Sequence, residues 1–144
     1  MEKKKSGFSH DSAQTAYETG RAYYDAQDYD RAVACFLQAA DAGHTDAEKC
    51  LGCCYEAGQG VPRDDKAAVN HYPHAAWHGN VFAQYNLGNC YFEGRGVKRD
   101  EKAAFEWFRL AAQNGYAIAQ HRTGLCCLSG IGTEKNAREA ADWF

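Results

Sequence analysis

The chain has 144 residues and a formal net charge of −3, and it is long enough for one domain with a hydrophobic core. It lacks the basic charge that binding to a phosphate backbone requires, which argues against nucleic acid as a partner. No apolar run reaches the length of a membrane span and no signal-peptide pattern is present, so we expect a cytoplasmic protein that does not insert into membranes.

Residues 1–11 form a polar N-terminal arm that includes a run of three lysines, and we expect this arm to be disordered. From residue 12 onward, alanine and larger apolar residues recur at spacings of three and four, which is the period of an α-helix. The chain has only two prolines but fourteen glycines, a composition that favours helices separated by glycine turns. We therefore expect residues 12–144 to form a single all-α domain.

A repeat of 36 residues organises most of this domain. Gly52, Gly88 and Gly124 are each 36 residues apart. When residues 47–82 are aligned with residues 83–118, 16 of 36 positions are identical. Repeats of this length are typical of helical solenoids, in which each unit is a pair of helices that buries its apolar face against its neighbours.

Each unit carries signals for the ends of its two helices. The first helix of residues 83–118 is expected to end at Gly94, because glycine readily adopts the left-handed conformation of a C-terminal cap. Thr45 with Glu48 predicts a capping box at the start of the equivalent helix one unit earlier. The second helix of three units is expected to begin after a side chain that can accept hydrogen bonds from free N–H groups: Asp64, Asp100 and Asn136.

The most regular unit carries a set of small, apolar and charged residues at fixed spacings: Ala83, Leu87, Gly88, Tyr91, Gly94, Gly96, Val97, Asp100, Lys102, Ala103, Ala111, Ala112 and Gly115. This pattern resembles the Sel1-like repeat (SLR) family, a branch of the tetratricopeptide superfamily, and the resemblance covers roughly residues 12–144. It implies a right-handed α-α superhelix, or solenoid, that serves as a protein-interaction scaffold without catalytic residues or cofactors.

The first and last units depart from this pattern. Residues 12–46 lack the GxGV loop and resemble an ordinary tetratricopeptide repeat, whereas residues 47–82 and 83–118 are complete SLR units. Residues 119–144 form a partial unit that stops about halfway through its expected second helix, with Trp143 and Phe144 at the end. An uncapped apolar end can pack against a further unit or another chain, so self-association through the C-terminal end is an alternative function.

Three histidines could form a different kind of site. His71, His74 and His78 lie at i, i+3 and i+7 on one side of a predicted helix, a spacing that can bring imidazoles together around a metal ion. The following unit has no histidine at the equivalent positions, which favours a structural role and no bound metal. Pro73 lies within the same helix and predicts a local kink, since proline removes a helical hydrogen bond.

The seven cysteines are an odd number in a chain without a secretory signal, which argues against a disulfide framework. Cys50 and Cys53 form a CxxC motif, which in other settings marks a redox dithiol or half of a zinc site. Cys54, Cys90 and Cys126 are spaced by 36 and fall at one inner position. We expect free thiols, and a metal-binding or redox module remains the alternative to a scaffold.

In tetratricopeptide units, four positions around the packing glycine of the first helix line the concave groove. Carried over by position, these residues are Tyr17, Arg21, Tyr24, Asp25, Lys49, Glu56, Tyr85, Asn89, Phe92, Glu93, His121 and Leu125. Aromatic side chains on such a surface are good anchors for a protein or peptide partner, so we expect a non-enzymatic adaptor. Replacing Tyr85 and Phe92 with alanine is then expected to weaken partner capture without lowering thermal stability.

Overall fold

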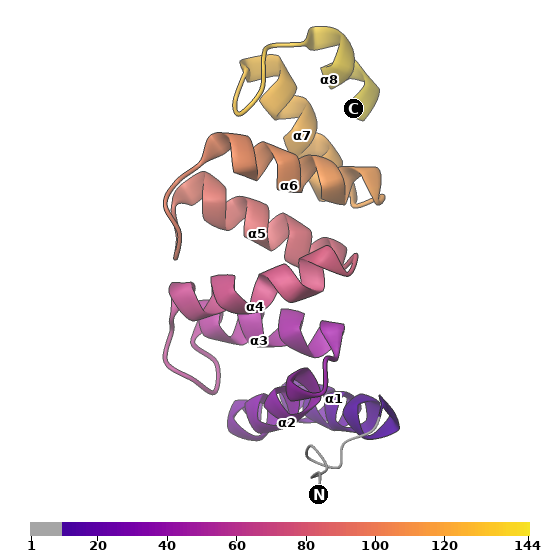
Figure 1. Ribbon diagram of the computed structural model, residues 1–144, viewed down its shortest axis with the longest axis vertical. Coiled ribbons are helices and arrows are strands. Elements are labelled where there is room, and N and C mark those ends of the chain that lie inside the picture. The colour runs from indigo at the N-terminus through magenta and orange to yellow at the C-terminus, as the bar shows by residue number, and fades with distance from the viewer. Residues whose placement is uncertain (1–9) are drawn as a thin grey trace, which may run out of the picture.

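The structure is a computed structural model that describes residues 10–144, and within this range it contains eight α-helices and no strand. The helices are α1 (His10–Asp25), α2 (Tyr29–Asp41), α3 (Thr45–Ala57), α4 (Asp65–Trp77), α5 (Val81–Glu93), α6 (Glu101–Gln113), α7 (Ala117–Ser129) and α8 (Ala137–Trp143). They stack along the long axis of the molecule, from α1 and α2 at one end to α7 and α8 at the other (Figure 1).

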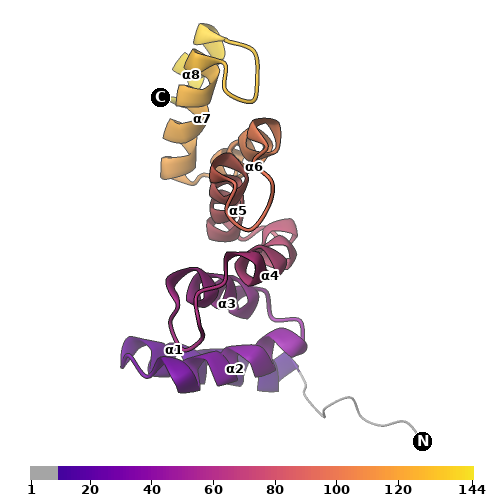
Figure 2. The ribbon, with the colours of Figure 1, turned by 90° about the vertical axis from the view of Figure 1, so that its left-hand side faces the viewer.

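The helices pack as four pairs, α1 with α2, α3 with α4, α5 with α6 and α7 with α8. We call the first helix of each pair helix A and the second helix B. Each helix B also packs against helix A of the next pair, which joins the pairs into one extended stack (Figure 2). The predicted all-α solenoid is confirmed.

Within each pair, a glycine of helix A lies against an aromatic ring of helix B. A Cβ atom added to Gly88 would lie 2.7 Å from the ring of Phe108, which is closer than carbon atoms approach without a shift. The same arrangement recurs in the other pairs, as Gly20 with Phe36, Gly52 with Tyr72 and Gly124 with Phe144, the residue that directly follows α8. The repeated glycine therefore lets the two helices approach closely enough for the ring to fill the space between them.

The predicted starts of three helices B are confirmed. Asp64, Asp100 and Asn136 each accept a hydrogen bond from the backbone N–H three residues later, at 3.1, 3.1 and 2.9 Å. Gly94 is the left-handed C-cap of α5, with φ of 72°. These caps satisfy backbone groups that a helix end leaves without partners, and so fix where the helices begin and end.

The capping box predicted at Thr45 and Glu48 is wrong. Thr45 is already the first residue of α3, and the cap is His44, whose Nδ1 accepts a hydrogen bond from the N–H of Ala47 at 3.2 Å. Glu48 is not available for a capping box because its Oε1 lies 2.8 Å from Nδ1 of His71 on α4. Glu48 therefore contributes to the contact between α3 and α4 and does not cap the start of α3.

The first helix begins earlier than the sequence predicts. α1 starts at His10, so the predicted disordered arm of residues 1–11 extends two residues too far. Asp11 lies in the first turn of α1, where a carboxylate is favourable to the helix dipole. The rest of the predicted arm, residues 1–9, lies outside the described residues.

The connection within a pair is longer in the last three pairs than in the first. It comprises three residues, 26–28, between α1 and α2, but seven residues in 58–64, 94–100 and 130–136. Each long loop folds back onto the preceding pair. Gly96, for example, lies directly against the carbonyl group of Asp65 at the start of α4. The loops therefore hold successive units together, in addition to reversing the chain direction.

Helix α4 continues without interruption through Pro73, from Asp65 to Trp77. The neighbouring side chains of Tyr72 and Ala75 are fully buried, and this packing holds the segment helical although one hydrogen bond is missing. The proline therefore does not break the helix, and the kink stays a prediction.

Pro73→Ala is expected to raise the free energy of unfolding by about 2 kcal/mol, because alanine restores the missing N–H and removes the steric conflict in a helix interior. For a chain of this size, the thermal midpoint should then rise by roughly 5 °C in a calorimetric scan. Pro62→Ala is the matched control, since Pro62 is exposed in the loop before α4 and should affect stability little. Equal midpoints for the two variants would contradict the cost assigned to Pro73.

Candidate interaction surface

All twelve predicted partner-binding residues lie on helices A, and the structure brings many of them together in two groups. One group lines a pocket between α1 and α3, and the other surrounds Arg122 at the junction of α5 and α7. We call these twelve residues, together with Arg122, the helix A surface. Its parts differ in charge and polarity along the solenoid.

The first part is a pocket of about 190 Å³ between α1 and α3, lined by four of the predicted residues, Arg21, Tyr24, Asp25 and Lys49, and by Phe36, Cys50 and Cys53. Tyr24 is held in place because its hydroxyl donates a hydrogen bond to Gln59 Oε1 at 2.7 Å. Arg21 is held by a hydrogen bond from its Nη1 to the hydroxyl of Tyr17 at 3.1 Å. The pocket thus presents two cations, one carboxylate and one phenol.

The middle of the helix A surface is an ion-pair network around Arg95. This side chain donates from Nη1 to Glu56 Oε2 and from Nε to Glu93 Oε1, both at 2.6 Å. Glu56 also accepts a hydrogen bond from the buried hydroxyl of Tyr72 at 2.6 Å, and burial raises the pKa of that tyrosine. The two predicted acidic residues are therefore already paired, and they offer a partner little free negative charge.

Arg95 was not among the predicted residues, although its position carries a signal. It is the middle residue of the GxG loop that follows α5, and this loop folds back onto the preceding unit. In the unit before, the equivalent Gln59 accepts the hydrogen bond from Tyr24. In both cases the loop residue contacts the side chain four residues after the packing glycine of the preceding helix A.

The third part surrounds Arg122 of α7, whose guanidinium carbon lies 5.2, 5.7 and 5.9 Å from the ring centres of Phe108, Phe92 and Tyr85. Its Nη1 and Nη2 lie 3.4 Å from Asn89 Oδ1 and from the hydroxyl of Tyr85. Three predicted residues of α5 thus converge on an arginine that sequence reasoning missed. The position of Arg122 in the repeat could have indicated its role. Arg122 lies two residues before its packing glycine, and Cys50, which lines the pocket, lies two residues before the packing glycine of α3.

Five predicted residues lie outside both groups: Tyr17, Glu56, Glu93, His121 and Leu125. His121 is exposed and its ring centre lies 5.5 Å from that of Phe144, whereas Leu125 is 41% exposed on the same helix. Leu128, one turn further along α7, is 45% exposed. The helix A surface is therefore charged at α1 and α3 and aromatic at α5, and at α7 Arg122 and His121 lie on the same helix as two exposed leucines.

The contacts of Tyr85 and Phe92 change the effect expected of their replacement. Both side chains are half-buried and pack against the core, with ring centres 5.5 and 6.4 Å from that of Phe108. Alanine at either position would remove packing from the core as well as from the surface. The expectation of unchanged thermal stability does not fit this geometry, and Tyr24 is the better residue for a binding test.

His71 and His74 of α4 and His78, its C-cap, are not brought together around one point. His71 stacks on Tyr55, with ring centres 5.5 Å apart, and is paired with Glu48. His74 and His78 lie side by side at 4.5 Å, and His78 Nδ1 donates to the carbonyl oxygen of His74. Within residues 10–144 no group of three or more histidine, cysteine or acidic side chains is arranged to hold a metal ion. The geometry therefore gives the metal-binding alternative no support.

All seven cysteines are free, as predicted. Burial raises the pKa of Cys54 and Cys90 to about 12 and that of Cys126 to about 11. Burial also raises the pKa of Cys50 and Cys53, the two residues of the CxxC motif. Since the thiolate is the reactive form and burial disfavours it, these environments give the redox alternative no support.

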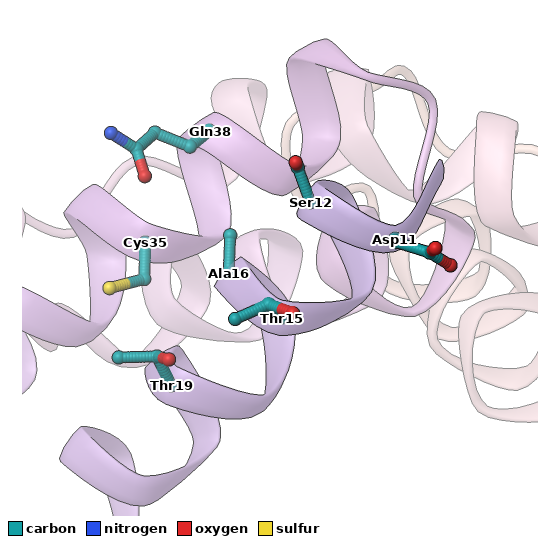
Figure 3. A pocket seen from close by; sticks show the side chains of 7 residues that line it. All are labelled: Asp11, Ser12, Thr15, Ala16, Thr19, Cys35 and Gln38. Carbon is teal, nitrogen blue, oxygen red and sulfur yellow. The ribbon is translucent and has the colours of Figure 1, made fainter. Parts of the chain in front are cut away.

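The two ends of the solenoid differ in polarity. At the N-terminal end, a pocket of about 430 Å³ on α1 and α2 is lined by Ala16, Cys35 and five polar residues, which include Thr15 and Thr19 (Figure 3). These threonines are exposed at positions where α3 buries Ala47 and Leu51. At the C-terminal end Phe144 is 61% exposed. Head-to-tail stacking of two copies would bury the threonines, and self-association through the C-terminal end stays a prediction.

None of the helices in the described residues is both long and apolar enough to span a membrane. Helix pairs in register and the packing glycines together define an α-helical repeat solenoid. The family model described as "Sel1 repeat" matches residues 13–44, 50–76, 81–116 and 117–144, so the chain belongs to the Sel1 repeat family. Sel1 repeats generally form protein-interaction scaffolds and are typically not enzymes.

Solved structures show similar solenoids. The chain is similar to c5321, a protective antigen of uropathogenic Escherichia coli with an SLR fold, at 38% identity and a TM-score of 0.88 over 91% of this chain and 29% of that one. It is also similar to a Sel1 repeat protein from Oxalobacter formigenes, at 33% identity and a TM-score of 0.85 over 88% of this chain and 52% of that one. The chain thus spans only part of the length of both proteins.

The cysteine rich protein B of Helicobacter pylori shares the fold alone, at 20% identity and a TM-score of 0.59 over 78% of this chain and 96% of that one. Among curated proteins, none matches this chain.

Proposed function

We propose that this chain is a non-enzymatic cytoplasmic scaffold that binds an extended segment of a partner protein along the helix A surface. The pocket between α1 and α3 is the observation that carries the proposal, because it is lined by charged and aromatic residues from two successive units. Residues 12–46 would supply a tetratricopeptide-like unit, and residues 47–82, 83–118 and 119–144 the Sel1 units that continue the surface.

The contacts within the helix A surface support binding because they hold its side chains in place before a partner arrives. Tyr24 is fixed by Gln59, and Arg122 is fixed by the rings of α5 and α6. Side chains that are already ordered lose little entropy when a partner binds, so a larger share of the contact energy appears as affinity. A segment that crosses the helices A would meet charged, aromatic and apolar positions in turn.

A site-specific photo-cross-linker tests this proposal. A benzophenone-bearing amino acid placed at Asp25, an exposed residue of the pocket, is expected to cross-link a partner in cell extract, which mass spectrometry then identifies. The same group placed at Trp77, which is 73% exposed on helix B α4, is the matched control and should not capture that partner. Tyr24→Ala is expected to reduce the affinity of the identified partner about tenfold, as loss of an aromatic anchor does.

Two results would contradict the proposal. One is equal cross-linking of the same proteins from Asp25 and Trp77. The other is unchanged affinity of the identified partner for a Tyr24→Ala variant whose circular dichroism spectrum and thermal midpoint match those of the parent chain.

A further inference from the structure

The cationic side chains that lie over aromatic rings fall into two classes. Within residues 10–144 six such side chains occur: Arg21, Arg31, Lys49, Arg99, Arg109 and Arg122. Three of them also have a carboxylate partner, since Arg31 pairs with Asp28, Arg99 with Glu101 and Arg109 with Glu106. Within the described residues, the other three have no carboxylate within ion-pair distance, and these are the three that belong to the helix A surface.

Two of the three acidic residues of the same surface are already paired with another arginine. Glu56 and Glu93 are both bound to Arg95. Of the residues that line the pocket between α1 and α3, Asp25 is the one carboxylate beside the two cations Arg21 and Lys49. A chain with a formal net charge of −3 therefore carries three cations without an ion-pair partner on the surface proposed to bind a partner, and Asp25 is the carboxylate nearest to two of them in the pocket.

The position of Arg122 suits a carboxylate. A guanidinium group has five N–H donors in a plane, and the guanidinium carbon of Arg122 lies over the rings of Tyr85, Phe92 and Phe108 at distances typical of cation–π contacts. Its two hydrogen bonds, both 3.4 Å long, are weak ones. The rings thus hold the group in place while donors stay available for a bidentate bond with a carboxylate.

From this charge distribution we infer that the partner segment is acidic, with one side-chain carboxylate bound between Arg21 and Lys49 in the pocket and a second one bound to Arg122. This inference rests on the proposed function and specifies the chemistry of the partner. Because the net charge of the whole chain is negative, the attraction is short-range and depends on these three side chains. The exposed leucines of α7 would contact apolar residues of the same segment.

Fluorescence anisotropy with labelled peptides tests the inference. The probe is a peptide of Glu-Gly-Leu repeats, acetylated and amidated so that its only carboxylates are on side chains, and the comparison peptides contain Gln-Gly-Leu or Lys-Gly-Leu. The glutamate peptide is expected to bind, and its affinity should fall as sodium chloride is raised, since salt screens half-exposed charge pairs. The glutamine and lysine peptides are expected to bind at least tenfold more weakly.

Charge-neutralising variants locate the binding. Lys49→Gln and Arg122→Gln are each expected to weaken binding of the glutamate peptide about tenfold, because each removes a charge-assisted hydrogen bond. Arg31→Gln is the matched control, since Arg31 also lies over a ring but is paired with Asp28 outside the helix A surface. Arg122→Lys keeps the charge and is expected to retain part of the affinity, which separates loss of binding from loss of folding.

The inference is overturned if the glutamine peptide binds as tightly as the glutamate peptide, if no peptide binds, or if Arg31→Gln weakens binding as much as Arg122→Gln. If the glutamine and glutamate peptides bind equally and Tyr24→Ala still weakens their binding, the proposed function is retained but the partner segment need not be acidic. Binding that neither Tyr24→Ala nor the charge variants affect would reject the helix A surface, and the proposed function with it.

Discussion

Gly96→Ala is expected to lower the free energy of unfolding by about 3 kcal/mol, the sum of a left-handed backbone cost of about 1 to 2 kcal/mol and an overpacking cost of similar size. Gly96 has φ of 75°, and a Cβ added there would overlap with the carbonyl oxygen of Asp65 at the start of α4. A backbone carbonyl within a helix cannot move aside as a flexible side chain can. The methyl group would therefore push the loop away from the preceding unit, and Arg95 with it.

Gly115→Ala provides the matched control for this prediction. Gly115 also has a positive φ, 92°, but a Cβ there would have no neighbouring atom within 4 Å. Its substitution should cost only the backbone term, about 1 kcal/mol. Urea unfolding followed by circular dichroism measures both variants. If the two substitutions lowered the unfolding midpoint by the same amount, the loop would not be a structural contact between units.

The GxG loops also show what the sequence could and could not predict about the fold. The repeat length and the pairing of helices follow from the glycine spacing, and the starts of α4 and α6 follow from Asp64 and Asp100. The structure confirms both caps. The loops appeared to be turns only, because the contact of Gly96 with Asp65 joins residues of two different units. A pattern within one unit does not reveal which atoms of a neighbouring unit approach it.

The helix A surface shows the same limit at the level of side chains. Register placed Tyr24 and Lys49 correctly on helices A, and the structure puts them in one pocket. Register did not reveal that Arg95 neutralises Glu56, nor that Arg122 lies among aromatic rings. Both arginines are at positions occupied by different residue types in the other units, so their residue type is not part of the repeated pattern. Their roles depend on long side chains that reach an adjacent unit.

Phe108→Ala is expected to lower the free energy of unfolding by about 4 kcal/mol, in the range that loss of a buried phenylalanine side chain costs. Phe108 is fully buried against Gly88, and its ring lies near those of Tyr85 and Phe92. The resulting cavity would lie between α5 and α6, at the point where the ring packs against Gly88. For a chain of this length, the thermal midpoint should fall by roughly 10 °C or more.

Phe144→Ala is the control for this prediction, because Phe144 occupies the same register in the last pair but is 61% exposed. Its replacement should cost only about 1 kcal/mol, in proportion to the smaller apolar area that it buries. The two variants also separate stability from binding. Of the three rings around the guanidinium of Arg122, that of Phe108 is the nearest. Its loss should therefore weaken binding of the glutamate peptide even at a temperature where the variant is fully folded. Equal unfolding free energies for the two variants, or full peptide affinity in Phe108→Ala, would contradict the view that this core ring supports the helix A surface.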